Sequence, residues 1–198
     1  MNNNFIIVPS IFLDKYNQIN IKLDLSWYWY AKKIGISLFP IINTKNIDQI
    51  KNIKGIIFTG SGDLYKFQKN KQNLIRDNYE KKIIKYAEKK KIKCLLICRS
   101  FQHYSSLNKM KIIKTKKHVR QNHLIFNKKK NKKLMVNSFH NYAIRLNKNT
   151  KFRELYLSFD GNIELISKGI FLGMMFHPER KNPDQKKIDI LIKNHFNI

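Results

Sequence analysis

The stretch "LLICRSFQHY" (residues 95–104) decides the fold that this sequence predicts. Its apolar run does not alternate with polar residues, which is typical of a strand buried on both faces. The polar residues after Cys98 are compatible with a helix. Cys98 is therefore either a nucleophile on a strand-to-helix turn, where the positive end of the helix lowers the pKa of the thiol, or a buried thiol of the core.

Short apolar runs alternate with amphipathic segments up to this point of the chain. Strands are predicted at residues 5–9, 36–41 and 92–98, and a further strand begins at residue 55 and runs into the loop that ends at residue 63. Helices are predicted at residues 23–35, 47–52, 74–91 and 99–107. Alternating strands and helices predict a parallel sheet with crossover helices.

The second half of the chain is richer in strands. They are predicted at residues 123–126, 134–139, 153–159, 163–167 and 170–176, and a last helix at residues 184–196. Asp160-Gly161 indicates a hairpin turn. No repeat and no linker rich in proline, glycine and serine divides the chain, so residues 1–198 are expected to form a single domain.

The composition is strongly basic. The 198 residues include 40 lysines and arginines against 13 aspartates and glutamates, a net charge of +27. Such a charge favours a polyanionic partner. The lysines are spread along the whole chain, however, which favours compositional drift and makes nucleic acid an unexpected partner. The run "NKKKNKK" (127–133) is predicted to be a solvated turn.

The two cysteines predict the redox setting. Cys94 and Cys98 lie along one predicted strand, too far apart to form a disulfide bond. This indicates a reduced, cytoplasmic environment. The first ten residues are typical of a strand and not of a signal peptide, and no window approaches the roughly 18 apolar residues of a membrane span. No membrane association is predicted.

Two other strand ends carry polar groups. The segment "FHPER" (176–180) puts His177 and Glu179 on the same side of an extended chain, where a carboxylate can orient an imidazole base. Alternatively, His177 is a strand-end histidine beside a surface glutamate. The segment "TGSGD" (59–63) either directs backbone N–H groups towards an oxyanion or is an ordinary turn.

Together these segments resemble the class I glutamine amidotransferases, and among them the gamma-glutamyl hydrolase-like branch. The motifs "FTGSGD", "LICRSFQ", "VNSFHNYAI" and "MFHPER" follow in the order of that branch, over roughly residues 5–195. The segments "LDLSW" (23–27) and "NSFHNYAI" (137–144), with Arg180, resemble the gamma-glutamyl-CDP-amidate hydrolases of capsule biosynthesis. The resemblance implies a flavodoxin-like three-layer α/β/α fold with a mostly parallel central sheet and antiparallel strands in its second half.

The resemblance also implies catalytic roles. Cys98 would be the nucleophile, His177 its general base and acid, and Glu179 the carboxylate that orients His177. The N–H of Arg99 and a backbone N–H near Ser61 and Gly62 would form the oxyanion hole. The implied reaction is attack on a gamma-amide carbon, formation of a glutamyl thioester and hydrolysis to glutamate, without a cofactor.

Substrate contacts follow from the same resemblance. They fall on Gly60, Gln102, Asn137, Ser138, Phe139 and His140. One departure from the family pattern concerns the turn at the cysteine, where small residues are usual two positions before and after it. Leu96 and Ser100 stand there, and Leu96 must find room.

Three functions stay open at this stage. The leading one is a hydrolase for a small gamma-glutamyl amide, with a nucleotide-linked amine as one candidate. The second is a glutaminase subunit that supplies ammonia to a synthetase partner. The third is a catalytically weak basic binding protein that retains the fold.

Two further groups of residues are candidates for binding a ligand. His118 and His123 flank "VRQN" and could bind a metal ion, but no carboxylate or thiol clusters with them in the sequence, so no metal is predicted. Trp27, Tyr30 and Ile34 share one helix face that is predicted to pack in the core. Tyr28 and Trp29 lie off that face, and at least one of them is expected at the mouth of the site.

Overall fold

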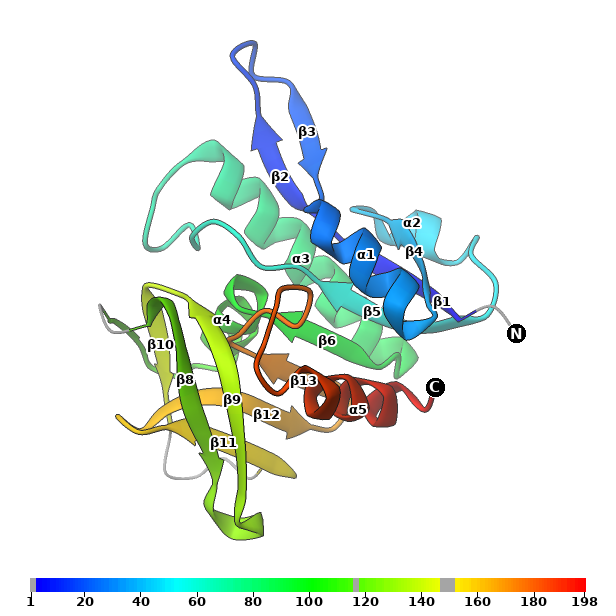
Figure 1. The fold of residues 1–198 in the computed structure, drawn as a ribbon. Helices are drawn as coiled ribbons and strands as arrows, with labels where there is room; N and C mark the ends of the chain where they lie inside the picture. Colours follow the sequence, from blue (N-terminus) through cyan, green and yellow to red (C-terminus); the bar gives the residue numbers. More distant parts are fainter. Residues whose placement is uncertain (1–2, 116–117, 147–151) are drawn as a thin grey trace.

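The computed structural model describes residues 3–115, 118–146 and 152–198. Its main feature is a large sheet in which five strands run parallel in the order β4-β1-β5-β6-β13 (Figure 1). These strands are β1 (Asn4–Val8), β4 (Ser37–Pro40), β5 (Ile53–Phe58), β6 (Cys94–Ile97) and β13 (Phe171–Met174). The predicted parallel half of the sheet is confirmed.

The sheet continues beyond β13 with antiparallel strands. They are β12 (Asn162–Lys168), β11 (Glu154–Ser158), β8 (Val119–Asn127) and β9 (Lys132–Phe139), with β10 (Tyr142–Arg145) and β7 (Ile112–Lys114) off this path. The strand β13 pairs in parallel with β6 and antiparallel with β12, so it joins the two halves. The predicted change to antiparallel strands in the second half is thus confirmed.

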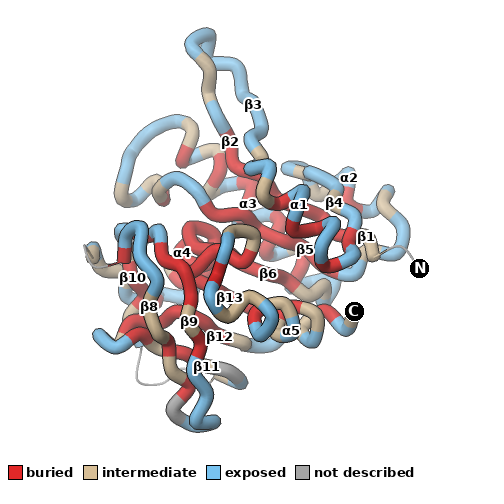
Figure 2. Tube along the Cα trace, in the orientation of Figure 1, coloured by how far each residue is buried: buried red, intermediate tan, exposed pale blue. Residues whose placement is uncertain are grey.

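Helices cover both faces of the parallel half. They are α1 (Leu25–Ile34), α2 (Thr44–Ile47), α3 (Lys71–Lys90), α4 (Arg99–Leu107) and α5 (Gln185–Phe196). The strands have two buried faces, and neighbouring residues of one strand enter different cores: Leu95 and Ile97 pack with residues of α1 and α5, whereas Cys94 and Leu96 pack with residues of α2, α3 and α4. This is the predicted three-layer α/β/α architecture, and Figure 2 shows the buried residues concentrated along the central strands.

Local signals explain the ends of α1. The side chain of Asp24 accepts a hydrogen bond from the backbone N–H of Ser26, and Gly35 ends the helix with a φ of 77°. Trp27, Tyr30 and Ile34 are buried, as their spacing predicts. Tyr28 and Trp29 are 62% and 58% exposed.

Several short elements were not predicted. The hairpin of β2 (Ser10–Leu13) and β3 (Ile19–Lys22) projects from the body of the molecule (Figure 1). The predicted turn in "NKKKNKK" contains the 3-10 helix η1 (Lys128–Lys130) and connects β8 to β9. None of the helices in the described ranges is long and apolar enough to cross a membrane.

Candidate active site

Cys98 occupies a strained turn between β6 and α4. Its backbone has a φ of 47° and a ψ of −102°, a conformation that residues other than glycine rarely adopt. The backbone N–H of Cys98 donates to the carbonyl oxygen of Met174 at 2.7 Å, and its own carbonyl oxygen accepts from the N–H of Gln102 at 2.9 Å. The thiol is therefore held at the first turn of the nine-residue helix α4.

The two residues that depart from the family pattern are accommodated. Leu96 is fully buried in the core beneath α3 and α4. Its partner on β13 is Gly173, where an added Cβ would lie 2.6 Å from the ring of Phe101. The small residue that lets α4 approach the sheet thus stands on the neighbouring strand. Ser100 is also fully buried, and its hydroxyl donates to the carbonyl oxygen of Thr59 at 2.7 Å.

His177 follows β13, the strand beside β6. Its Nδ1 lies 2.7 Å from Oε1 of Glu179, and its side chain is 4% exposed. Burial by itself lowers the pKa of His177, but the charge of Glu179 and the hydrogen bonds with Cys98 and Glu179 raise it to about 10. A charged imidazole beside the thiol is the arrangement that activates a cysteine.

Asn137 fixes the backbone of His177. Its Oδ1 accepts from the N–H of His177 at 2.8 Å, and its Nδ2 donates to the carbonyl oxygen of the same residue at 2.9 Å. Asn182 donates to that carbonyl oxygen as well. The predicted substrate residue Asn137 thus has both ends of its amide bound to the chain that carries His177.

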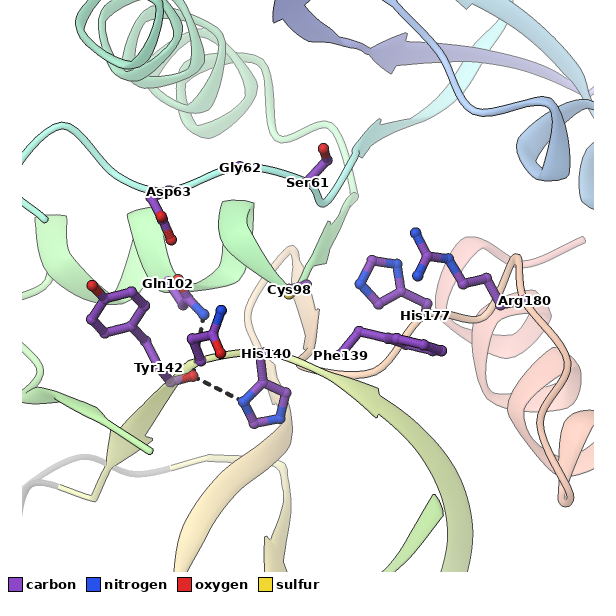
Figure 3. A pocket seen from close by; sticks show the side chains of 11 residues that line it. Ser61, Gly62, Asp63, Cys98, Gln102, Phe139, His140, Tyr142, His177 and Arg180 are labelled. Carbon is purple, nitrogen blue, oxygen red and sulfur yellow. Dashed lines mark hydrogen bonds between the residues drawn. The ribbon is translucent and has the colours of Figure 1, made fainter. Parts of the chain in front are cut away.

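The loop of residues 59–63 approaches both side chains. A Cβ on Gly60 would lie 2.7 Å from Cε1 of His177 and 3.3 Å from Cβ of Cys98, so only glycine fits there without a shift. Ser61 and Gly62 have φ values of 76° and 74°. Figure 3 shows both residues across the cavity from His140 and Tyr142, on the loop that passes Cys98.

Arg76 orients this loop. Its guanidinium donates to the carbonyl oxygens of Thr59, Gly60 and Ser61 at 2.8, 2.8 and 2.6 Å. The carbonyl and the N–H of a trans peptide point in opposite directions. The N–H groups of Ser61 and Gly62 therefore point away from Arg76, which leaves them free to bind an oxyanion.

Glu80 holds the two buried arginines in place. Its carboxylate is fully buried and lies 2.9 Å from Nε of Arg76, 2.6 Å from Nη1 of Arg99 and 3.0 Å from Nδ1 of His103. Burial raises the pKa of Glu80, but the guanidinium groups of Arg99 and Arg76 outweigh it and hold the pKa well below its ordinary value. Arg99 is also paired with Asp77. The structure adds this network to the predicted site; its signal in the sequence is the spacing of Arg76 and Glu80 on the face of α3 that also carries Ile83.

A cavity of about 240 Å³ opens at Cys98 (Figure 3). It brings together eleven residues: Ser61, Gly62, Asp63, Cys98, Gln102, Phe139, His140, Asn141, Tyr142, His177 and Arg180. Gln102 Nε2 donates to the carbonyl oxygen of Tyr142 at 3.2 Å, and the guanidinium of Arg180 lies 4.6 Å from the ring centre of Phe139. Asp63, Asn141 and Tyr142 lie within the motifs quoted from the sequence, but no role at the site was predicted for them individually.

The segment 137–140 meets this cavity in part. Phe139 is a lining residue with a ring that is 38% exposed. Ser138 is fully buried, and its hydroxyl donates to the carbonyl oxygen of His118 at 2.6 Å. His140 contributes to the lining, but its ring points away from Cys98 (Figure 3), and its Nε2 lies 3.5 Å from Glu164. Asn137 and Ser138 therefore bind neighbouring backbone groups and do not line the cavity.

A second cavity of about 240 Å³ lies on the other side of His177. Its lining comprises Ser10, Lys22, Asp24, Trp27, Thr59, Gly60, Ser61, His177, Glu179 and Arg180. Arg180, which also lines the first cavity, is 3.8 Å from Asp24. The residues of "LDLSW" that reach the site are thus Asp24 and Trp27. The expectation that Tyr28 or Trp29 would stand at its mouth is wrong for both described cavities at Cys98 and His177.

The sequence and the fold both resemble those of known proteins. The sequence model of the Peptidase C26 family matches residues 31–179. A search among curated proteins found no match.

Solved structures share the fold. A protein described as a GMP synthase subunit from Thermoplasma acidophilum has a TM-score of 0.72 at 13% identity, covering 100% of this chain and 94% of that chain. A glutamine amidotransferase from Thermotoga maritima has a TM-score of 0.65 at 15% identity, with coverages of 98% and 83%. The PurLQS structure from the same organism has a TM-score of 0.68 at 16% identity, with coverages of 98% and 99%. At these identities the likeness shows the fold alone, which is that of the class I glutamine amidotransferases.

Proposed function

The chain belongs to the Peptidase C26 family, and from this premise we propose that it is a cysteine hydrolase that cleaves a gamma-glutamyl amide bond and releases glutamate. The observation that carries the proposal is that Cys98 and His177 line one cavity and both lie beside Gly60, with Glu179 2.7 Å behind the imidazole. Such a chain of nucleophile, base and orienting carboxylate is what acyl transfer through a thioester requires.

The mechanism assigns a task to each group. The Sγ of Cys98 attacks the gamma-carbonyl carbon, and the developing oxyanion accepts hydrogen bonds from the N–H groups of Arg99 and of Ser61 or Gly62. His177 gives its proton to the departing amine, which leaves a glutamyl thioester on Cys98. His177 then takes a proton from water, the resulting hydroxide attacks the thioester, and glutamate and the thiolate are released.

Charges in the two cavities suggest how the substrate lies. Asp63 and Gln102 line the first cavity and suit the alpha-ammonium group of a glutamyl unit. The second cavity contains Lys22 and Arg180 beside the carboxylates of Asp24 and Glu179, and its two cations suit an anionic group on the amine side of the bond. In a gamma-glutamyl unit joined to a nucleoside diphosphate, the glutamyl unit would occupy the first cavity and the diphosphate the second. We therefore take gamma-glutamyl-CDP-amidate, an intermediate of capsule biosynthesis, as the substrate to test.

Glutamate release from the purified protein tests the proposal. Glutamine, gamma-glutamyl-aminobutyrate and gamma-glutamyl-CDP-amidate are offered in parallel. We expect the fastest release from the nucleotide amidate and a loss of about 10³-fold or more in Cys98→Ala, because the nucleophile is absent. Cys94→Ala is the matched control: Cys94 is a buried cysteine whose pKa burial raises well above its ordinary value, and this variant should retain activity. Full activity in Cys98→Ala would remove the proposal.

A glutaminase subunit is the second candidate. It is favoured by the names of two structural neighbours, a glutamine amidotransferase and a GMP synthase subunit. In that case glutamine would be the preferred substrate, ammonia the second product, and a synthetase partner would raise the rate. If ammonia release from glutamine remains slow when a lysate of the source cells is added, this result would argue against a glutaminase subunit.

A further inference from the structure

Three histidines surround a buried glutamate in the antiparallel half of the molecule. His118 precedes β8, His123 lies in β8, His140 connects β9 to β10, and Glu164 lies in β12. The side chains of Glu164 and His140 are fully buried, and those of His118 and His123 are 4% and 16% exposed. The sequence suggested no carboxylate beside His118 and His123; the pairing of β12 with the neighbouring strands brings Glu164 to them.

In this histidine cluster, each histidine has one ring nitrogen at a similar distance from the carboxylate of Glu164. Glu164 Oε1 lies 3.4 Å from Nδ1 of His118, and Oε2 lies 3.5 Å from Nε2 of His123 and 3.5 Å from Nε2 of His140. Among the described residues, none of these five atoms has a hydrogen-bond partner. Five buried polar atoms that converge without partners are unusual, because each would ordinarily cost free energy.

The outer contacts of the rings show which nitrogen faces Glu164 with a lone pair. Nδ1 of His140 lies 2.9 Å from the carbonyl oxygen of Tyr142, which can only accept, so this nitrogen carries the proton. Nε2 of His118 lies 3.1 Å from Oδ2 of Asp160 and donates to it for the same reason. In the neutral rings, Nδ1 of His118 and Nε2 of His140 are then acceptors that face another acceptor, the carboxylate of Glu164.

A cation between them resolves this conflict. Donor atoms bound at about 2.1 Å around a tetrahedral ion lie roughly 3.4 Å from one another. The distances from Glu164 to the three histidine nitrogens match this value and are longer than a strong charged hydrogen bond. Imidazole nitrogens with one carboxylate suit Zn²⁺ and related divalent transition metals better than Mg²⁺ or Ca²⁺. We propose that His118, His123 and Glu164, whose facing atoms all lie within 4.8 Å of one another, form a site for one divalent transition-metal ion of the zinc type, with His140, 3.5 Å from Glu164, as the fourth ligand.

Two further observations support the site. Asp160 stands behind His118 as the outer carboxylate that metal-binding histidines usually have. A cavity of about 650 Å³, lined in part by His118, His123 and Asp160, opens beside the histidine cluster and gives an ion access from the surface.

The site has a structural task in the fold. It ties β8, the connection from β9 to β10, and β12 to one point. The same connection carries His140 and Asn141, which with Tyr142 at the start of β10 form one wall of the cavity at Cys98. An ion bound here would hold that wall, at a distance from the reacting atoms.

Titration of the purified, chelator-treated protein with Co²⁺ tests the proposal. The Cys98→Ala variant serves as the starting protein, so that the thiolate at Cys98 does not bind the ion. We expect one equivalent of Co²⁺ per chain, the intense visible absorption of a four-coordinate ion, displacement by Zn²⁺ and a higher thermal midpoint with the ion bound. His123→Asn and Glu164→Gln should each weaken binding more than about 10-fold. Asp160→Asn should weaken it about 10- to 100-fold.

His195→Gln is the matched control, since His195 is a partly buried histidine of α5 that bonds to the carbonyl oxygen of Cys94. It should bind the ion as tightly as the starting protein. Absence of stoichiometric binding by the starting protein would overturn the proposal and leave protonated histidines as the partners of Glu164. Equal binding by His123→Asn and Glu164→Gln, with unchanged circular dichroism in all variants, would overturn it as well.

Discussion

Glu179 controls the charge of His177 at the scale of single residues. The pKa of His177 lies at about 10, above its ordinary value of 6.5, because the carboxylate of Glu179 and the contact with Cys98 outweigh the effect of burial. The stabilising pairing with Glu179 is therefore complete below about pH 6.5 and is lost as the pH rises through about 10. The protonated imidazole needed for departure of the amine disappears over the same range.

Glu179→Gln should thus move the alkaline limb of the kcat/KM profile to lower pH. We expect a shift of roughly 1 to 3 pH units, because one opposite charge beside the imidazole is removed. The measurement is glutamate release between pH 6 and 11. Glu88→Gln, a change at an exposed glutamate of α3, is the control and should leave the limb in place. An unchanged alkaline limb in Glu179→Gln would show that another group sets it.

A glycine is needed at position 60 because of the close approach of His177, and not because of the backbone conformation there. Its φ lies outside the left-handed region, so alanine could adopt it, but the added Cβ would lie 2.7 Å from Cε1 of His177. In Gly60→Ala either the imidazole or the loop must move. We expect kcat/KM to fall by about 10²-fold with a small change in the urea midpoint. Wild-type activity in this variant would mean that His177 can shift freely.

The residues proposed to carry the chemistry could be located from the sequence more readily than those that position them. Cys98 and His177 each end an apolar run, and the ends of parallel strands meet at one edge of the sheet. The contacts of Asn137 with His177 and of Arg76 with the 59–63 loop join residues far apart in the chain. No periodicity or turn signal encodes such contacts, so they emerged only in three dimensions.

Among the elements, α3 supports the site from outside both cavities, because Arg76 on this helix binds the 59–63 loop. Glu80 on this helix is the common partner of Arg76 and Arg99, and all three side chains are almost completely buried. In Glu80→Gln the two guanidinium groups would lose their compensating charge. We expect a loss of about 3 to 5 kcal/mol in the free energy of unfolding.

Urea denaturation followed by circular dichroism measures this loss. Glu88→Gln is the matched control on the same helix and should change the free energy of unfolding by no more than about 0.5 kcal/mol. Similar stabilities for the two variants would show that Glu80 does not compensate the arginines.

Element boundaries were predictable where local chemistry sets them. The ends of α1 follow from Asp24 and Gly35. The apolar spacing gave the end of α3 to within one residue, but the helix begins three residues before the predicted residue 74, because the side chain of Asn70 caps it. The strands β2, β3, β7 and β10 were missed because they have only three or four residues each, too few for a period to show. All four residues of β3 are exposed, so they carry no hydrophobic pattern at all.

For the whole molecule, the net charge of +27 affects the encounter with substrate. A nucleotide-linked amidate is an anion, whereas glutamine has no net charge. Raising the ionic strength from about 0.01 to 0.15 M shortens the Debye length from about 30 to 8 Å. We expect kcat/KM for the amidate to fall about 10-fold or more over this range and that for glutamine to change little.

Steady-state rates for both compounds at five salt concentrations measure this effect. A steep decrease for the amidate alone would give the excess lysine a role in steering. Equal, weak decreases for both would assign the lysines to compositional drift.

The strand β13 divides the residues of the proposed catalytic machinery from the residues that line the cavity for the substrate. The parallel half supplies Cys98 and the 59–63 loop, and β13 supplies His177 directly beside them. The antiparallel half supplies Phe139, His140, Asn141 and Tyr142, which close the cavity without contributing to the nucleophile. For enzyme engineering, a mutant library confined to Asn141 and Tyr142 would therefore diversify the acyl group that the proposed enzyme accepts, whereas Phe139, whose ring packs edge-on against His177, should be kept.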